Sequence, residues 1–398
     1  MSRRVRSWDI YCRVVDNFGD IGVCWRLARQ LATERGDAVR LWVDQVAALT
    51  RIWPEVAPER DEQRCAGVEI RRWSEPLPVV TPHDAVIEAF ACKTPDAVVE
   101  AMAARKPAPV WVNLEYLSAE AWVDGCHLLP SPHPRLPLTK HFFFPGFTPR
   151  TGGLLREADL LARRDAFRRD TAARRALWDA LGLRTPAAGE LRVSLFAYPN
   201  AAAIRLFSVW AAGDRPVICV VPEGVLRSEI AGYFGSYPAA GGIAARGRLR
   251  LAVIPFVRQA DYDPMLWACD INFVRGEDSF VRAQWAGRPL VWQIYPQEGD
   301  AHLPKLEAFV DNYCADMDEP TAAAVRAFTY AWNGSGDAAA AWDAAQAALP
   351  AWTAAADAWS ARLAAQPDLA SALAEAVENE ALVGADAHSV SARDENQL

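Results

Sequence analysis

Short β-rich segments alternate with helix-like segments twice along this chain of 398 residues, and no other feature restricts its possible folds so much. Strands that alternate with helices form largely parallel sheets with right-handed crossovers. In the first series, the helix-like run over 21–32 repeats apolar residues at the spacing of one helical face, at Val23, Leu27 and Leu31. The expected strands are 8–15, 39–43, 84–90 and 109–114 in the first series, and 191–196, 217–221, 249–256, 270–274 and 290–294 in the second.

An Arg-rich stretch between about 150 and 190 separates the two series. Arg150-Thr151-Gly152-Gly153 is a turn, and Arg184-Thr185-Pro186-Ala187-Ala188-Gly189 ends the helical run that follows it. A chain of 398 residues is also too long for one ordinary core. We therefore expect two α/β domains rather than one doubly wound sheet. The expected division is 1–165 and 166–349 for these domains, 350–384 for a C-terminal helical segment and 385–398 for a flexible tail.

The Ala-rich segment from Gly336 has Trp and Leu at helical spacing, and we expect Pro350 to divide it into two helices. Two α/β domains followed by helices are typical of nucleotide-sugar glycosyltransferases with the GT-B architecture, in which two Rossmann-like domains face a cleft. Ligands of such sheets bind beyond the carboxyl ends of the strands.

Charge and cysteine content exclude several classes of protein. The net charge of −8 and the pI of about 5.4 argue against a general nucleic-acid or membrane binder. The eight Cys residues form no Cys-x-x-Cys pair and several lie in apolar runs, so we interpret them as reduced core residues. No run approaches the ~20 apolar residues of a membrane span, and residues 1–6 do not begin a signal peptide. We expect a cytoplasmic protein.

The segment Arg275-Gly276-Glu277-Asp278-Ser279-Phe280 joins an apolar strand-like run to a helix-like run. A strand, a tight Gly turn and a helix start can bind an anion, because the first helical N–H groups have no backbone partner and the helix dipole is positive there. Arg275 adds a cation, Ser279 a hydroxyl, and Glu277 and Asp278 two carboxylates. These groups suggest a nucleotide-sugar pocket, although Asp and Ser are also the commonest helix caps.

A second polar turn, Val15-Asp16-Asn17-Phe18-Gly19-Asp20-Ile21-Gly22, follows the first expected strand, where open α/β sheets place their sites. It contains neither Gly-x-Gly-x-x-Gly nor Gly-Lys-Ser/Thr, so it is neither a dinucleotide fingerprint nor a P-loop. Its two carboxylates, Asp16 and Asp20, suit a cationic or hydroxylic acceptor better than a phosphate. The simpler interpretation is that Asp20 caps the following helix, and this is compatible with a catalytic role.

Aromatic and amide side chains follow other strands of the second series. Tyr198 and Asn200 come after the strand over 191–196, Phe256 ends the strand over 249–256, and Gln259 lies three residues beyond it. Tyr295 ends the last strand. An aromatic face can stack on a nucleotide base and Gln can meet its polar edge, so these positions are candidates for a nucleotide site.

The sequence does not indicate metal ligands. Asp261-Tyr262-Asp263 has the Asp-x-Asp form of metal-dependent glycosyltransferases, but such tripeptides are frequent by chance. The six His residues show no His-Glu-x-x-His or similar spacing. We therefore expect neither a metal nor a cofactor.

Five segments match the motifs of one known family. The longest are the runs from Trp8 to Leu27 and from Asn272 to Trp285. The shorter ones run from Asn113 to Ser118, from Leu129 to Pro134 and from Phe143 to Thr148. With these motifs the chain resembles, over roughly 8–359, the bacterial protein-arginine rhamnosyltransferases that modify elongation factor P (the EarP family).

The resemblance implies that elongation factor P binds to the N-terminal Rossmann-like domain and dTDP-β-L-rhamnose to the C-terminal one. It also implies transfer of rhamnose, with inversion and without a metal, to one Arg of elongation factor P, which activates that factor for ribosomes stalled at polyproline. No direct contact with nucleic acid or membrane is implied. The acidic residues of the family fall on Asp16, Asp20 and Glu277 of this sequence, and its dTDP contacts fall on Tyr198, Phe256, Gln259, Arg275, Asp278, Ser279 and Tyr295.

An Arg acceptor explains the two carboxylates of the first turn. Guanidinium is a poor nucleophile because it is delocalised and protonated, with a pKa above about 12. A carboxylate that grips it can localise its charge, aim one nitrogen and accept the proton as the new bond forms. We expect Asp20 to be the base and Asp16 to orient it, although the sequence also allows the reverse. We expect Glu277 to hold sugar hydroxyls or to help position the acceptor.

Two other hypotheses stay open. The chain could be a GT-B glycosyltransferase that uses another nucleotide sugar or another acceptor, and competition between dTDP- and UDP-rhamnose would separate these enzymes. It could instead be a non-catalytic nucleotide-sugar sensor or a binding module for a basic translation factor. Such a protein would bind its ligand without turnover, and Asp16 and Asp20 would then have no catalytic role.

Overall fold

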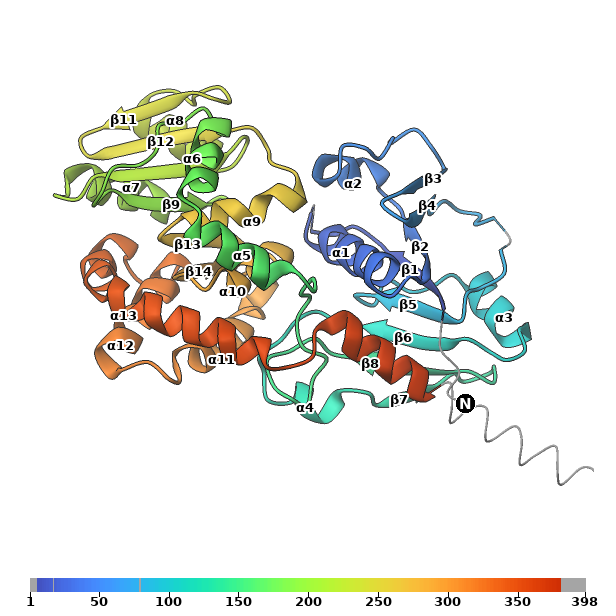
Figure 1. Cartoon of the computed structure of the whole chain (residues 1–398). Coiled ribbons are helices and arrows are strands. Elements are labelled where there is room, and N and C mark those ends of the chain that lie inside the picture. The colour runs from blue at the N-terminus through green and yellow to red at the C-terminus, as the bar shows by residue number, and fades with distance from the viewer. Residues whose placement is uncertain (1–5, 17, 79, 381–398) are drawn as a thin grey trace, which may run out of the picture. The chain divides into compact units, whose positions relative to one another are not determined.

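The chain forms two compact units (Figure 1). The structure, a computed structural model, describes residues 6–16, 18–78 and 80–380, so the expected tail over 385–398 lies outside it. Unit 1 takes the residues up to Ala158 and those from Gln366 onward, and unit 2 takes Asp159–Ala365. Each unit has its own sheet, which confirms two α/β domains in place of one doubly wound sheet. The assignment of acceptor binding to 1–165 and donor binding to 166–349 stays a prediction.

Unit 1 is built on an eight-stranded sheet with the order β3-β4-β2-β1-β5-β6-β8-β7. The six inner strands pair in parallel, and β3 and β7 pair antiparallel at the edges. The strands are β1 (Ser7–Cys12), β2 (Ala38–Val43), β3 (Glu62–Cys65), β4 (Val68–Arg72), β5 (Ala85–Ala89), β6 (Val110–Leu114), β7 (Pro130–Pro132) and β8 (Thr139–Phe143). The helices are α1 (Gly19–Glu34), α2 (Val46–Ile52), α3 (Asp96–Ala104) and α4 (Val123–Cys126).

The inner strands of unit 1 explain where its functional residues gather. β5 is buried along its whole length and β1 along all but its first residue, as in a parallel sheet covered on both faces. α1 packs on β1, β2 and β4, and it is buried on all sides over residues 20–28, as a helix enclosed by its surroundings must be. Because β1, β5 and β6 are parallel neighbours, the residues that follow these three strands meet at one edge of the sheet.

A helix over 369–380 completes unit 1, although it follows unit 2 in the chain. Its side chains Leu373 and Val377 are fully buried. Gly153, with φ +67°, passes so close to the start of this segment that a Cβ there would lie 2.4 Å from the backbone oxygen of Pro367. Only Gly suits both this backbone conformation and this close approach.

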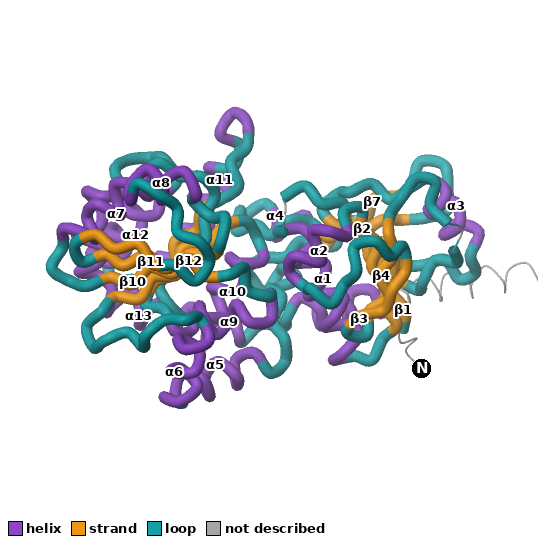
Figure 2. The backbone as a smooth tube through the Cα atoms, turned by 90° about the horizontal axis from the view of Figure 1, so that it is seen from above, coloured by secondary structure: helices purple, strands orange, loops and turns teal. Residues whose placement is uncertain are grey.

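Unit 2 contains a six-stranded sheet with the order β11-β12-β10-β9-β13-β14, parallel except for β11 at one edge. Figure 2 shows the strands of unit 2 with helices around them. The strands are β9 (Leu191–Leu195), β10 (Val217–Pro222), β11 (Ile243–Arg246), β12 (Leu249–Ile254), β13 (Ile271–Arg275) and β14 (Leu290–Gln293). The helices are α5 (Leu160–Arg169), α6 (Thr171–Ala180), α7 (Ala202–Ala212), α8 (Arg227–Phe234), α9 (Gln259–Ala268), α10 (Asp278–Ala286), a 3₁₀ turn η1 (Glu298–Asp300), α11 (Leu303–Cys314), α12 (Glu319–Trp332) and α13 (Ala338–Ala364).

The prediction that Pro350 divides the last helical segment is wrong. α13 continues from Ala338 to Ala364 with Pro350 inside it. A proline in a helix interior costs about 3 kcal/mol. Burial outweighs this cost, because Trp342, Trp352 and Trp359 lie buried along one side of the helix and each contributes roughly 1.5–3 kcal/mol.

All eight Cys residues are free thiols. Six of them are buried, as expected for core residues. Cys65, at the end of edge strand β3, and Cys126, at the end of α4, are partly exposed instead. These two short elements lie outside the inner strands of the sheet, which explains why the core expectation fails for them.

Candidate functional site

In unit 1, the turn between β1 and α1 is held by the side chain of Asp20. This residue lies in the first turn of α1, where the helix dipole favours a carboxylate, and it is only 2% exposed. Its Oδ2 atom accepts hydrogen bonds from the backbone N–H groups of Val15 (2.7 Å) and Asp16 (2.9 Å). The carboxylate therefore does not cap the helix's own N–H groups, as the simpler interpretation supposed, but binds the two residues that precede the helix.

Asp16 lies next to Asp20, as the sequence predicted. Its N–H donates to Asp20, and its C=O accepts from the N–H of Gly19 at 2.6 Å. A Cβ at Gly19 would lie 2.8 Å from Oδ2 of Asp16, so a glycine there gives the Asp16 carboxylate its room. Asp16 is partly exposed whereas Asp20 is buried, so the two carboxylates differ in their access to solvent. Asn17 of the same turn lies outside the described residues.

Two aromatic residues that the sequence reasoning missed belong to this site. The Tyr116 hydroxyl, after β6, donates to Oδ1 of Asp20 at 3.1 Å. The Tyr116 ring stacks on Phe90, after β5, with the ring centroids 4.4 Å apart, and it remains 37% exposed. Phe90 is the last residue of the expected strand over 84–90 and Tyr116 lies two residues after the one over 109–114, so the signal that could have found them is their position at strand ends, like that of Asp16. The sequence alone did not show that β5 lies next to β1 and β6 next to β5.

In unit 2, aromatic side chains and an arginine converge at the carboxyl ends of four strands; we call this group the strand-end cluster. The guanidinium of Arg275, the last residue of β13, lies 4.5 Å from the ring centroids of both Phe196 and Tyr198, which follow β9. The Tyr198 ring meets Tyr295, after β14, edge to face at 5.5 Å. The Phe196 ring meets Phe256, after β12, at 6.5 Å. Arg275 thus adds a positive charge to an aromatic surface.

The turn between β13 and α10 is closed by Ser279. Its hydroxyl donates to the C=O of Arg275 at 2.5 Å and accepts from the N–H of the same residue at 3.1 Å. Gly276 lies between them in the left-handed region, with φ 59°. The side chain of Glu277, at the N-cap position of α10, does not bond the helix N–H groups. The predicted strand, Gly turn and helix start are therefore present.

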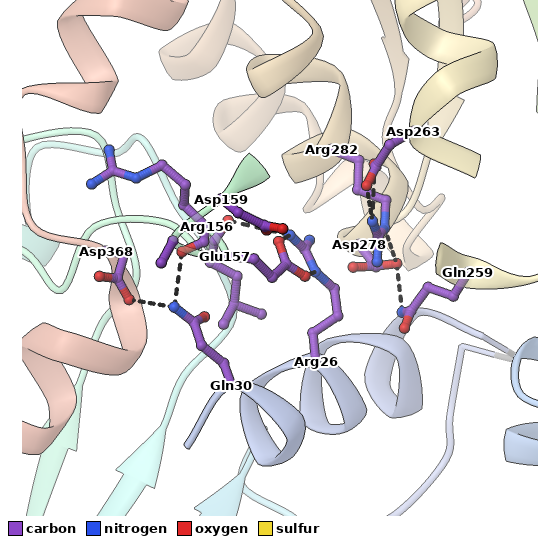
Figure 3. Close-up of polar contacts among 12 residues, drawn as sticks. Arg26, Gln30, Arg156, Glu157, Asp159, Gln259, Asp263, Asp278, Arg282 and Asp368 are labelled. Atoms are coloured by element: carbon purple, nitrogen blue, oxygen red, sulfur yellow. Dashed lines mark hydrogen bonds and ion pairs between the residues drawn. The ribbon is translucent and has the colours of Figure 1, made fainter. Parts of the chain in front are cut away.

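Asp278 belongs to a buried polar network, which Figure 3 shows. Its Oδ2 atom accepts from Nε2 of Gln259 (2.9 Å) and from Nε of Arg282 (3.1 Å). The Nη1 atom of Arg282 donates to both carboxylate oxygens of Asp263, each at 2.9 Å. Asp263 is therefore half of a buried ion pair, whereas Asp261 of the same tripeptide is largely exposed. The two acids of the Asp-x-Asp pattern do not act together.

The predicted site residues thus form two groups, one in each unit. Asp16 and Asp20 form the first group, in unit 1. The second group, in unit 2, contains Glu277 and all seven predicted nucleotide contacts, which are Tyr198, Phe256, Gln259, Arg275, Asp278, Ser279 and Tyr295.

The part of the chain that the structure describes contains neither a cluster of metal ligands nor a helix suited to cross a membrane. Over 6–16, 18–78 and 80–380, no three His, Cys, Asp or Glu side chains gather in a way that could hold a metal ion. Over the same residues, no helix combines the length and the apolar character that crossing a membrane requires.

Known proteins resemble this chain over nearly its whole length. Residues 8–378 match the family described as Elongation-Factor P (EF-P) rhamnosyltransferase EarP. A protein-arginine rhamnosyltransferase of Pseudomonas putida is 50% identical over 368 residues, which are 92% of this chain and 97% of that protein. One of Pseudomonas aeruginosa is 49% identical over 370 residues, which are 93% and 98% of the two chains.

Solved structures show the same architecture. A structure that explains EarP-mediated arginine glycosylation of translation elongation factor EF-P is 37% identical, with a TM-score of 0.67, and the match covers 94% of this chain and 99% of that one. A glycosyltransferase of Rickettsia africae is 8% identical, with a TM-score of 0.50 and coverage of 95% and 97%, and shares the fold alone. The expected GT-B class, with two Rossmann-like units and C-terminal helices, is confirmed.

Proposed function

The chain belongs to the elongation factor P rhamnosyltransferases, a family of glycosyltransferases, and from that premise we propose that it moves L-rhamnose from dTDP-β-L-rhamnose to an arginine of elongation factor P. The observation that carries this proposal is the 50% identity to a protein-arginine rhamnosyltransferase over 97% of its length. The carboxylate pair in unit 1 and the cationic aromatic cluster in unit 2 support it, since an arginine acceptor needs the first and a nucleotide diphosphate the second.

In the proposed mechanism, Asp20 and Asp16 receive the acceptor guanidinium. One carboxylate grips the guanidinium, aims one nitrogen at the anomeric carbon and takes its proton as the C–N bond forms. Asp20 suits the role of base because its hydrogen bonds to two backbone N–H groups and to Tyr116 fix its orientation. Asp16 suits the role of partner, being more exposed and bonded to Asp20 through its N–H.

The strand-end cluster is the proposed donor site. The rings of Phe256, Tyr198 and Tyr295 would stack on the base and the sugars, while Arg275 and the start of α10 would stabilise the charge that grows on the leaving diphosphate. Glu277 would hold hydroxyls of the rhamnose. Attack by the acceptor nitrogen from the face opposite the diphosphate inverts the anomeric carbon, so the β-linked donor gives an α-linked product without a covalent enzyme intermediate.

Metal independence and a cytoplasmic place of action are parts of the same proposal. Arg275 and the α10 N-terminus supply positive charge of the kind that a metal supplies to the diphosphate in other glycosyltransferases. The proposed acceptor acts on ribosomes, which implies that the transferase meets it in the cytoplasm. Turnover that persists at full rate in EDTA is the expected result, and loss of turnover that Mg²⁺ restores would contradict it.

The test of the function is the intact mass of purified elongation factor P after incubation with this protein and dTDP-β-L-rhamnose. We expect the mass of one deoxyhexose to be added, and we expect no addition when the acceptor Arg is replaced by Lys, whose single amine lacks the planar fork. UDP-rhamnose in place of the dTDP sugar is the control for donor choice. An unchanged mass despite tight dTDP binding would favour another acceptor or a non-catalytic sensor.

A further inference from the structure

The buried ion pair between Arg282 and Asp263 has no part in the function proposed above, and neither residue belongs to the predicted site. Arg282 extends from the second turn of α10, and Asp263 from α9. Both side chains are buried, with 3% and 4% exposure. Such a pair is weak evidence for stability, because the cost of burying two charges can exceed their attraction. A positional role is therefore worth testing.

The geometry shows what the pair could position. Nη1 of Arg282 is fixed by both oxygens of Asp263, while Nε of the same guanidinium donates to Oδ2 of Asp278. A guanidinium is planar and rigid, so fixing one end of it also fixes the direction of its other donors. Gln259 donates to the same oxygen of Asp278 at 2.9 Å. Arg282 thus joins Asp278, in the first turn of α10, to Asp263 of α9, and Asp278 in turn binds Gln259, the first residue of α9 (Figure 3).

We propose that Arg282 and Asp263 are positioning residues for the donor, which hold Asp278 and Gln259 at the angle and spacing that the nucleotide part of the donor requires. This inference rests on the proposed function of the strand-end cluster. It adds Arg282 and Asp263 to the residues that the proposed donor site depends on. Gln259 and Asp278 begin two different helices, so holding the hydrogen bond between them fixes the start of α10, where the diphosphate of the proposed donor would bind, against the start of α9.

The simpler explanation is that the pair merely holds α9 against α10, which are in contact. The two explanations differ in what a variant loses. A purely structural pair affects stability and leaves the affinity of folded molecules for their substrates unchanged. Loss of a positioning pair raises the KM for the donor and the Kd for dTDP, and it does not change the KM for the acceptor protein.

Unit 2 offers a matched control in the ion pair of Arg192 and Asp270. Asp270 accepts from the backbone N–H and from Nε of Arg192, each at 2.9 Å. Arg192 lies in β9 and Asp270 directly precedes β13, so the pair joins these two strands. It lies at the amino ends of these strands, whereas the strand-end cluster lies at their carboxyl ends. Its loss should lower the stability of unit 2 without a direct effect on the cluster.

The experiment compares Asp263→Asn with Asp270→Asn by calorimetric titration with dTDP and by steady-state kinetics with dTDP-β-L-rhamnose and elongation factor P. We expect Asp263→Asn to raise the Kd for dTDP and the donor KM about tenfold, with an acceptor KM within about threefold of wild type. Asp270→Asn should keep the wild-type Kd for dTDP. Equal dTDP affinity in both variants would overturn the positioning role.

A second variant keeps the test decisive if Asp263→Asn does not fold. Arg282→Lys retains the buried positive charge but cannot donate along two fixed directions, so it should fold and still bind dTDP about tenfold more weakly. Wild-type affinity in this variant would also contradict the inference. If wild-type protein binds UDP but no dTDP, the donor proposed above is wrong, and the same comparison repeated with UDP then decides the positioning role separately.

Discussion

At the scale of single residues, the side chain of Asp20 combines a structural and a proposed chemical task. Its Oδ2 atom holds the residues before α1, and its Oδ1 atom receives the Tyr116 hydroxyl. A carboxylate has about four lone-pair directions, so these three hydrogen bonds leave room for one more donor. An acceptor guanidinium could therefore bind Asp20 without breaking the bonds that orient it.

Replacement of Asp20 by Asn tests this base. The amide oxygen of Asn can accept the N–H groups of Val15 and Asp16, and its NH₂ group can donate to the Tyr116 oxygen, so the turn should persist. The proton acceptor is lost, and we expect turnover to fall about 10²-fold or more while the Kd for dTDP stays at its wild-type value. Rhamnosylation rates and calorimetry measure the two quantities. Near-normal turnover would move the role of base to Asp16.

Tyr116→Phe is the matched control for that experiment. This variant keeps the stack on Phe90 and removes only the hydrogen bond to Oδ1 of Asp20. A hydrogen bond to a charged carboxylate is worth about 1.5–3 kcal/mol, so we expect turnover to fall by roughly 10- to 100-fold. A larger loss than that of Asp20→Asn would show that the phenol, rather than the carboxylate, makes the more important contribution.

The sequence predicted the two acidic residues of this turn but not the aromatic pair beside them. Asp16 and Asp20 follow one strand and are four residues apart, so a local pattern sufficed. Phe90 and Tyr116 reach the same place from two other strands, and their proximity depends on the strand order β1-β5-β6. Strand order is a property of the whole sheet that one sequence does not reveal. Which of Asp16 and Asp20 is the base stays a prediction.

At the scale of elements, α10 is held at both ends by charged side chains. Its first turn carries Asp278 and Ser279, and its last carbonyl groups meet two arginines of α5. Arg164 donates to the C=O of Trp285 at 3.0 Å, and Arg168 donates to the C=O of Gly287 at 3.0 Å. Cations at a helix C-terminus stabilise it, because the last carbonyls have no partner within the helix and the dipole is negative there.

Removal of the Arg168 side chain should therefore loosen α10 from its C-terminal end. We expect Arg168→Ala to lower the free energy of unfolding of unit 2 by about 1–2 kcal/mol, as measured by urea denaturation. Arg169→Ala is the control, because Arg169 lies in the same helix with its side chain exposed, and should change stability by less than about 0.5 kcal/mol. Equal effects of the two variants would contradict a specific role of Arg168 at the α10 terminus.

Elements were predicted well where a local pattern defines them and poorly where packing decides. The expected strands over 39–43 and 109–114 correspond to β2 and β6 within one residue, since short β-rich runs between turns are local signals. Pro350 was expected to end a helix by its local effect alone. Buried Trp side chains before and after Pro350 in the chain, among them Trp342 and Trp359, keep α13 continuous.

At the scale of the whole molecule, unit 2 is an insertion in unit 1. The chain leaves unit 1 after Ala158 and returns to it at Gln366. The returning segment is bound to α1, since Nε2 of Gln30 donates to Oδ1 of Asp368 at 2.9 Å, as Figure 3 shows. Arg35 pairs with Glu378 further along, at 2.6 Å. Unit 1 thus depends on residues that come last in the described chain.

This arrangement predicts different outcomes for the two units when the chain is stopped after Ala365. Unit 1 would lose the buried side chains Leu373 and Val377, worth roughly 1.5–3 kcal/mol each, so we expect it to become sensitive to protease and rhamnosylation to cease. Unit 2 is complete by Ala365, and we expect dTDP to bind as in the full chain.

Limited proteolysis and calorimetry measure these two outcomes. A chain stopped after Glu380 is the control, because it keeps the helix over 369–380. Full rhamnosylation by the shorter protein would show that this helix is dispensable for unit 1.

The distribution of thiols makes the two units separately addressable by chemical labels. The three Cys residues of unit 2 are all buried, and burial raises the pKa of Cys269 to about 12 and that of Cys314 to about 11. Few thiolates, the form that reacts with maleimide dyes, exist at neutral pH on such groups. The partly exposed Cys65 and Cys126 both lie in unit 1. After their replacement by Ser, one thiol introduced on each unit would give a fluorescence pair that reports in real time how the separation of the units responds to donor and acceptor.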